Sequence, residues 1–199
     1  MSTINHRDEK ASKINKFPLL ANVMWRRAFY LAKENFKANE QINVIDPCCG
    51  GGSLLHCMNK SWVGKAYEPN YGDFMFADKL LDQENYNVDV INEPFEFHFS
   101  TPALPEYHIA VTIPYTDRQI DVSLEQDASC VSMKNYAYYI MNRTLDILQV
   151  GGYGIFALPK SIVSSDVFQE EVKCMSNKST VISSDSFEDY AIITLKKEK

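Results

Sequence analysis

Apolar residues recur along this chain with two different periods, and segments of the two kinds alternate. Residues 17–36 carry apolar side chains three or four positions apart, with Pro18 near the start, which predicts an amphipathic helix. Short runs rich in β-branched and aromatic residues predict seven strands, at 43–46, 62–67, 88–91, 108–112, 153–158, 180–184 and 190–196. Helical spacing between them predicts further helices at 53–60, 71–81, 134–148 and 167–175.

This alternation predicts an α/β fold, with a mostly parallel seven-stranded sheet and helices on both faces. Ligands in such sheets bind at the carboxyl ends of the strands. Unusual residues stand at the predicted carboxyl ends of five strands; they are Asp46, Glu68, Asn92, Thr112 and Pro159. We therefore expect one shared pocket at this edge of the sheet.

A glycine turn follows the first predicted strand. Residues 46–52 read Asp-Pro-Cys-Cys-Gly-Gly-Gly, and an apolar stretch comes directly after them. Glycines at such a turn let the backbone approach a ligand closely, whereas a turn without a ligand would lose conformational entropy for little structural return. The spacing is not the Gly-x-Gly-x-x-Gly of dinucleotide sites, and it lacks the Lys-Ser/Thr of a phosphate loop.

Two motifs carry a resemblance to a known family. The Asp-Pro-x-Cys-Gly-x-Gly turn resembles the first motif of S-adenosylmethionine-dependent methyltransferases, above all those that methylate the exocyclic nitrogen of adenine in DNA or RNA. Residues 112–115 read Thr-Ile-Pro-Tyr, which resembles the family's catalytic tetrapeptide, Asn-, Asp- or Ser-Pro-Pro-Tyr/Phe, or Asn-Ile-Pro-Tyr in rRNA adenine dimethylases. The order of elements resembles the family over residues 17–197, which implies a Rossmann-like methyltransferase fold.

The resemblance implies S-adenosylmethionine as the cofactor. Its methionine end would contact the glycine turn. Glu68, after the second strand, would accept hydrogen bonds from the ribose hydroxyls. Asn92, after the third strand, would accept one from the adenine amino group, with Asp89 as a competing candidate. The cofactor-binding residues implied are Asp46, Pro47, Cys48, Gly50, Gly52, Glu68 and Asn92.

The same resemblance implies the catalytic residues Thr112, Pro114 and Tyr115. An exocyclic amine is a poor nucleophile because its lone pair is delocalised into the ring, and accepting its hydrogens localises that pair. Tyr115 would stack on a flipped-out base. Thr112 reaches less far than Asn and accepts more weakly than Asp, so a second reading stays open: a catalytically weak or inactive cofactor-binding module that regulates a partner subunit. Methylation of a protein amide ranks lower, because Ile113 replaces the first proline.

Composition narrows the class of protein. The 199 residues predict one methyltransferase-like domain over 17–199 after a flexible terminus at 1–16. No apolar run approaches the ~20 residues of a membrane span. The five cysteines are odd in number, with Cys48 beside Cys49, and their spacing fits no common zinc pattern. We therefore expect reduced thiols, a cytoplasmic location and no metal.

The formal charge of −6 argues against a stand-alone nucleic-acid binder. Basic residues gather between Lys10 and Lys37, either as a local patch or as a solvated helix face. DNA or RNA remains the expected substrate. Relatives that act on DNA carry a separate target-recognition domain, for which this chain has no room. Sequence-specific action would therefore need a specificity subunit, or the segments 93–106 and 116–131.

Overall fold

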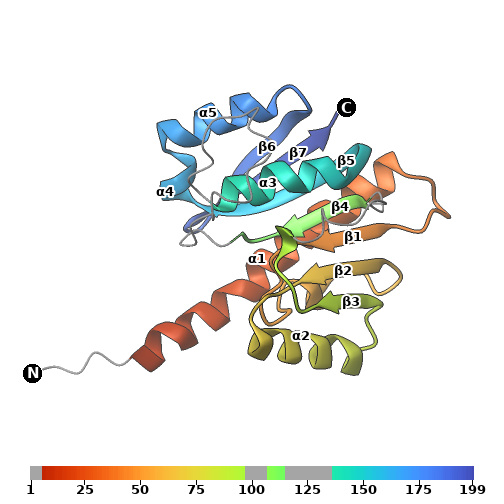
Figure 1. Cartoon of the computed structure of the whole chain (residues 1–199), viewed down its shortest axis with the longest axis vertical. Helices are drawn as coiled ribbons and strands as arrows, with labels where there is room; N and C mark the ends of the chain where they lie inside the picture. Colours follow the sequence, from red (N-terminus) through yellow and green to blue (C-terminus); the bar gives the residue numbers. More distant parts are fainter. Residues whose placement is uncertain (1–5, 97–106, 115–135) are drawn as a thin grey trace, which may run out of the picture.

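The computed structural model describes residues 6–96, 107–114 and 136–199, and for residues 6–17 only the backbone. Seven strands form one sheet in the order β3-β2-β1-β4-β5-β7-β6 (Figure 1). Their bounds are β1 Asn43–Asp46, β2 Val63–Tyr67, β3 Val88–Ile91, β4 Tyr107–Thr112, β5 Leu148–Pro159, β6 Ser179–Phe187 and β7 Tyr190–Lys197. The predicted seven-stranded α/β fold is confirmed.

The sheet is mixed, not uniformly parallel. Strands β1 to β5 run parallel to their neighbours, whereas β7 is antiparallel to both β5 and β6. The tight turn between β6 and β7 forces this reversal, because parallel neighbours need a long crossover. The five parallel strands are the ones that can bring their carboxyl ends to a common edge.

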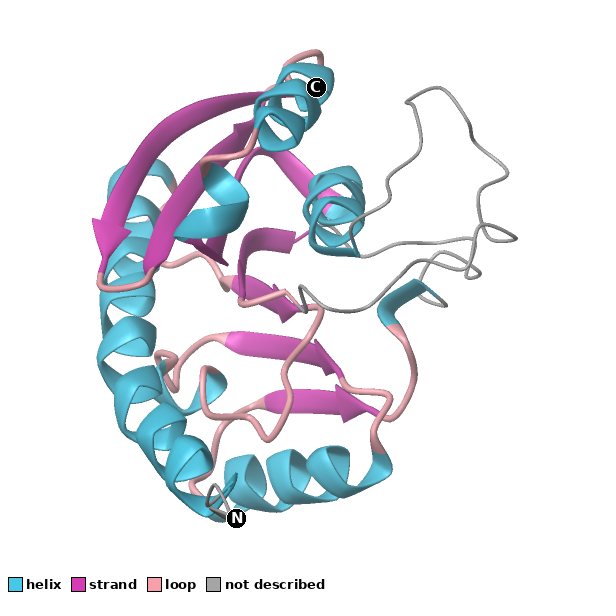
Figure 2. Cartoon of the chain, turned by 90° about the vertical axis from the view of Figure 1, so that its left-hand side faces the viewer, coloured by secondary structure: helices cyan, strands magenta, loops and turns pink. Residues whose placement is uncertain are grey.

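Helices cover both faces of the sheet, as predicted (Figure 2). Their bounds are α1 His6–Asn35, η1 Leu55–Cys57, α2 Tyr71–Gln83, α3 Tyr136–Ile147, α4 Lys160–Val163 and α5 Asp166–Met175. Successive strand residues alternate between two cores. Val44 packs with α1, η1 and α2, whereas Ile45 packs with α3 and α5.

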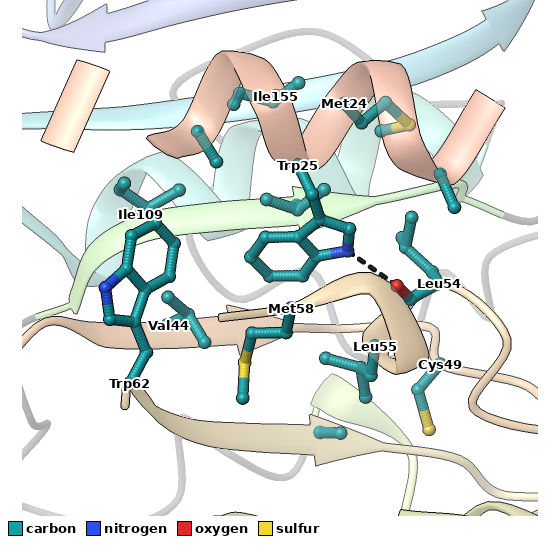
Figure 3. Packing of buried hydrophobic residues seen from close by; sticks show 14 of the residues in the cluster. Met24, Trp25, Val44, Cys49, Leu54, Leu55, Met58, Trp62, Ile109 and Ile155 are labelled. Atoms are coloured by element: carbon teal, nitrogen blue, oxygen red, sulfur yellow. Dashed lines mark hydrogen bonds between the residues drawn. The ribbon is translucent and has the colours of Figure 1, made fainter. Parts of the chain in front are cut away.

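The predicted helix at 53–60 is wrong. Only one 3₁₀ turn, η1, forms between the glycine turn and β2. Leu54 and Leu55 are buried as the apolar spacing indicates, but the helix that buries them is α1, which packs on the same face of the sheet. Trp25 of α1 donates its indole N–H to the Leu54 carbonyl at 2.6 Å, and the ring packs beside Trp62 and Met58 (Figure 3). α1 thus covers the face that the missing helix would have covered.

The first helix begins earlier than predicted. It starts at His6, so Pro18 lies inside the helix and not in its first turn. Asn22, one turn later, donates its side-chain amide to the Pro18 carbonyl at 2.8 Å. The flexible terminus at 1–16 and the single-domain boundary stay predictions. Within the described part of the chain, no helix is long and apolar enough to cross a membrane.

Candidate functional site

The carboxyl ends of the parallel strands carry the predicted site residues in a row. Asp46 and Thr112 are the last residues of β1 and β4, while Glu68 and Asn92 directly follow β2 and β3. Since the strand order is β3-β2-β1-β4, these residues line one edge in the order Asn92, Glu68, Asp46, Thr112. The order reverses between β1 and β4, and such a switch point is where open α/β sheets form their binding crevice.

Asp46 is fully buried at this switch point. Its Oδ1 accepts a hydrogen bond from the Cys48 N–H at 3.1 Å, which orders the turn. Its Oδ2 has no hydrogen-bond partner among the described residues. Burial raises the pKa of Asp46 to about 7; Thr112 and the Cys48 N–H lower this pKa, and the charge of Glu68 raises it. A buried acid with a free oxygen would attract a cationic or hydrogen-bond-donating ligand.

Thr112 supplies a second unsatisfied group beside the first. Its side chain is fully buried, and its hydroxyl has no hydrogen-bond partner within the described residues. The hydroxyl lowers the pKa of Asp46 as a weak hydrogen-bond donor to its carboxylate, although no well-formed hydrogen bond joins the two side chains. Pro114 is also buried, two residues beyond the strand. Tyr115, the third predicted catalytic residue, lies outside the described residues.

The glycine turn needs its glycines for two different reasons. Gly50 and Gly52 have φ of 51° and 79°, in the left-handed region that disfavours other residues. At Gly52, a Cβ would also come within 3.1 Å of the Ala77 side chain on α2. The glycines therefore let the turn pack directly on α2. Pro47 and Cys48, the other predicted residues of this turn, are buried.

Glu68 holds the glycine turn to the start of α2. Its side chain is 1% exposed, with Oε2 accepting from the Gly50 N–H at 2.9 Å and Oε1 from the Asn70 N–H at 2.7 Å. Charge-assisted bonds of this kind are among the stronger hydrogen bonds in proteins. The carboxylate and the Gly50 N–H, both predicted to meet the cofactor, thus satisfy each other.

Asn70 contributes to the site although the sequence alone did not assign it. Its side-chain oxygen accepts hydrogen bonds from Gly72 and Asp73, which caps the N-terminus of α2. Its own N–H is one of the two donors to Glu68. An Asn followed by an acid three residues later is a helix-start signal, so this role was accessible from the sequence.

The Asn92 amide is held by two backbone carbonyls. Its Nδ2 donates to the backbone carbonyls of Glu68 at 2.9 Å and Pro69 at 3.3 Å, which leaves Oδ1 as an acceptor on an exposed residue. Asp89 lies within β3 instead, 4.0 Å from Lys65 on the neighbouring strand. Of the two candidates, Asn92 is the one at the carboxyl edge.

The cysteines near the turn are packing residues. Cys48 and Cys49 are both buried, and burial raises the pKa of the Cys49 thiol well above its usual range, so it stays neutral. In the described segments, no group of three or more His, Cys, Asp or Glu side chains could hold a metal ion.

Solved structures similar to this chain include S-adenosylmethionine-dependent methyltransferases. A structure from Listeria monocytogenes assigned to class I of these enzymes has a TM-score of 0.75 at 12% identity, over 89% of this chain and 60% of its own. This chain has the class I methyltransferase fold. An rRNA methylase from Streptococcus thermophilus (TM-score 0.56, 15% identity, 85% and 93% covered) shares it.

A methyltransferase structure from Streptococcus mutans, in complex with S-adenosylhomocysteine, is similar at TM-score 0.55 and 15% identity, over 79% of this chain and 89% of its own. The fold therefore agrees with the cofactor expected from the sequence. No protein-family model matches the chain, and no curated protein matches it in sequence. At these identities the comparisons establish the fold.

Proposed function

We propose that the chain is an S-adenosylmethionine-dependent N-methyltransferase acting on the exocyclic amine of adenine in DNA or RNA. The observation that carries this proposal is the pair Asp46 and Thr112. Both are fully buried at the topological switch point, and each has a polar atom without a partner among the described residues. Leaving such atoms unsatisfied costs about 1–3 kcal/mol each, and a bound ligand removes that cost.

The residues present fit the cofactor in part. Asp46 Oδ2 would accept from its ammonium group, and Asn92 Oδ1 from its adenine amine. Glu68 would accept from the ribose hydroxyls only after its buried carboxylate becomes accessible. When bound, S-adenosylmethionine supplies an electrophilic methyl group. A cation beside Asp46 favours the ionised carboxylate and lowers its pKa below 7, so cofactor binding near neutral pH would release protons.

The protein must also position the exocyclic amine of adenine and make its nitrogen more nucleophilic. In this proposal the Thr112 hydroxyl oxygen accepts a hydrogen bond from the amine N–H, and this bond localises the nitrogen lone pair. Pro114 stiffens the backbone after the strand, and Tyr115 stacks on the extruded base. Thr112 carries one hydroxyl acceptor, so the proposal predicts a slow enzyme.

Methyl transfer from labelled S-adenosylmethionine to RNA and to single-stranded DNA tests this function. We expect transfer with the native chain, loss of transfer with Tyr115→Ala, and at least a tenfold loss of kcat with Thr112→Val. Valine has nearly the shape of threonine, and the hydroxyl that it removes has no partner among the described residues, so the free energy of unfolding should stay the same or rise by up to about 3 kcal/mol. Absence of transfer to every nucleic acid tried would sink the proposal.

The acceptor at Thr112 favours a second candidate, a cofactor-binding module that regulates a partner subunit. Thr112 carries one hydroxyl oxygen on a short, β-branched side chain, where Asn would reach further and Asp would accept more strongly. Calorimetry distinguishes the two functions. Binding of S-adenosylmethionine without turnover, together with a co-purifying subunit, would favour the module, whereas turnover by the purified chain alone would exclude it.

A further inference from the structure

A recess lies away from the glycine turn, between α1 and the segment that leads into β2. Its volume is about 230 Å³. The residues that line it are Asn22, Trp25, Arg26, Phe29, Tyr30, Cys57, Asn59 and Trp62. Trp62 precedes the amino end of β2 and Glu68 follows its carboxyl end, so roughly 20 Å of extended chain separate the recess from the candidate cofactor site.

The lining combines aromatic faces with a cation. Trp25 and Trp62 are buried with ring centroids 6.1 Å apart, while Phe29 and Tyr30 are 46% and 55% exposed. Two large aromatic side chains exposed at adjacent positions, beside two buried tryptophans, form an apolar patch of the kind that often marks an interaction site. Arg26 is exposed and makes no hydrogen bond or ion pair within the described residues.

Arg27, the next residue on α1, differs from Arg26 because its side chain has partners within the fold. Arg27 forms an ion pair with Asp185 at 2.7 Å and donates to Ser183 and Thr194, so it ties α1 to the strands β6 and β7. Among the described residues Arg26 has no such contact, so its guanidinium can meet an anion.

Two amides leave one donor and one acceptor available at the recess. The Asn22 amide donates to the Pro18 carbonyl, which leaves its oxygen as an acceptor. The Asn59 oxygen accepts from the Ser61 N–H and hydroxyl, which leaves its NH₂ group as a donor. A planar ring with both donors and acceptors on its edge, joined to an anion, matches these groups. The volume lies below the roughly 300–1,000 Å³ of pockets for larger ligands, so it suits a single ring system.

We propose that this recess binds one nucleotide of a single-stranded nucleic acid, with the base against the aromatic residues and the phosphate on Arg26. The inference rests on the proposed function for its substrate class. The recess would give this acidic protein a second contact with the nucleic acid, away from the carboxyl edge of the sheet. Stacking on aromatic side chains is the usual way in which single strands are held without sequence preference.

The chain's own fluorescence reports on this site, because its only two tryptophans both line the recess. Adenosine monophosphate and a single-stranded hexanucleotide, as RNA and as DNA, are titrated against the full chain. We expect saturable quenching by both probes, with the oligonucleotide binding more tightly. Arg26→Gln and Phe29→Ala should each raise Kd about fivefold or more.

The matched control is Lys33→Gln, which makes the same charge change on an exposed residue of α1 outside the recess. It should leave Kd within twofold. Absence of saturable quenching at millimolar nucleotide, equal weakening by Arg26→Gln and Lys33→Gln, or equal quenching by inorganic phosphate would each overturn the proposal. Methyl transfer is measured separately: transfer without quenching defeats this site alone, and quenching without transfer defeats the proposed function alone.

Discussion

Single residues at the switch point keep polar atoms that the fold itself does not use. Asp46 and Thr112 end adjacent strands, and each buries an atom without a hydrogen-bond partner among the described residues. Proteins keep such unsatisfied groups mainly where function requires them. The cofactor-free protein should therefore have a lower free energy of unfolding than it would have without these groups. Because Asp46 ionises, its share of this loss can be measured as a dependence on pH.

Replacing this carboxylate should stabilise the free chain, in a manner that depends on pH. Burial raises the pKa of Asp46 from an ordinary 3.8 to about 7, so between these values the folded protein holds a proton that the unfolded chain lacks. The free energy of unfolding then falls as pH rises from about 4 to 7, by up to roughly 4 kcal/mol. We expect Asp46→Asn to be more stable than the native chain at about pH 8, on the order of 1–4 kcal/mol, and similar to it near pH 4.

Urea denaturation of the cofactor-free protein at both pH values measures this difference. Asp89→Asn is the control, because that carboxylate is 72% exposed. It should change the free energy of unfolding by less than about 0.5 kcal/mol at either pH. An Asp46→Asn variant less stable than the native chain at pH 8 would show that the carboxylate is stabilised by a partner.

At the scale of elements, the sequence predicted which residues are buried better than it predicted their backbone. Runs of β-branched residues and the polar residues at their ends were enough to foresee the row from Asn92 to Thr112, because strand runs and the residues that end them are local signals. The spacing of Leu54, Leu55 and Met58 correctly marked a buried face, but burial by α1 satisfied it without a helix. The bond between Glu68 and Gly50 has no local signature, since it joins a side chain to a backbone N–H 18 positions away.

A hydrogen bond from Trp25 attaches α1 to the segment after the glycine turn, and we expect it to contribute to stability. The Trp25 indole donates to the Leu54 carbonyl, whereas the Trp62 indole packs in the same core without a hydrogen bond within the described residues. Trp25→Phe removes this hydrogen bond, although the Leu54 carbonyl keeps the one from the Cys57 N–H at 3.2 Å, and with the lost packing it should cost about 2 kcal/mol in the free energy of unfolding. Trp62→Phe makes the same change of side chain and should cost about 1 kcal/mol less. Equal losses in chemical denaturation would mean that packing alone attaches the helix.

For the whole molecule, the charge of −6 constrains how nucleic acid can bind. Affinity that comes from phosphates falls steeply with salt, because each neutralised phosphate releases counterions. An acidic chain that grips its substrate by stacking and one arginine has few counterions to release. Its affinity for single strands should therefore respond weakly to ionic strength.

We expect the logarithm of the association constant to fall against the logarithm of salt concentration with a slope no steeper than about −2, since each phosphate contact with a single strand contributes about −0.7. Affinity for a labelled hexanucleotide would then drop by no more than about 16-fold between 50 and 200 mM salt, as measured by fluorescence anisotropy. Arg26→Gln should make the slope shallower by about one contact, and Lys33→Gln should leave it unchanged. A slope of about −4 or steeper in the native chain would instead mean that an extended basic surface, and not the aromatic recess, holds the strand.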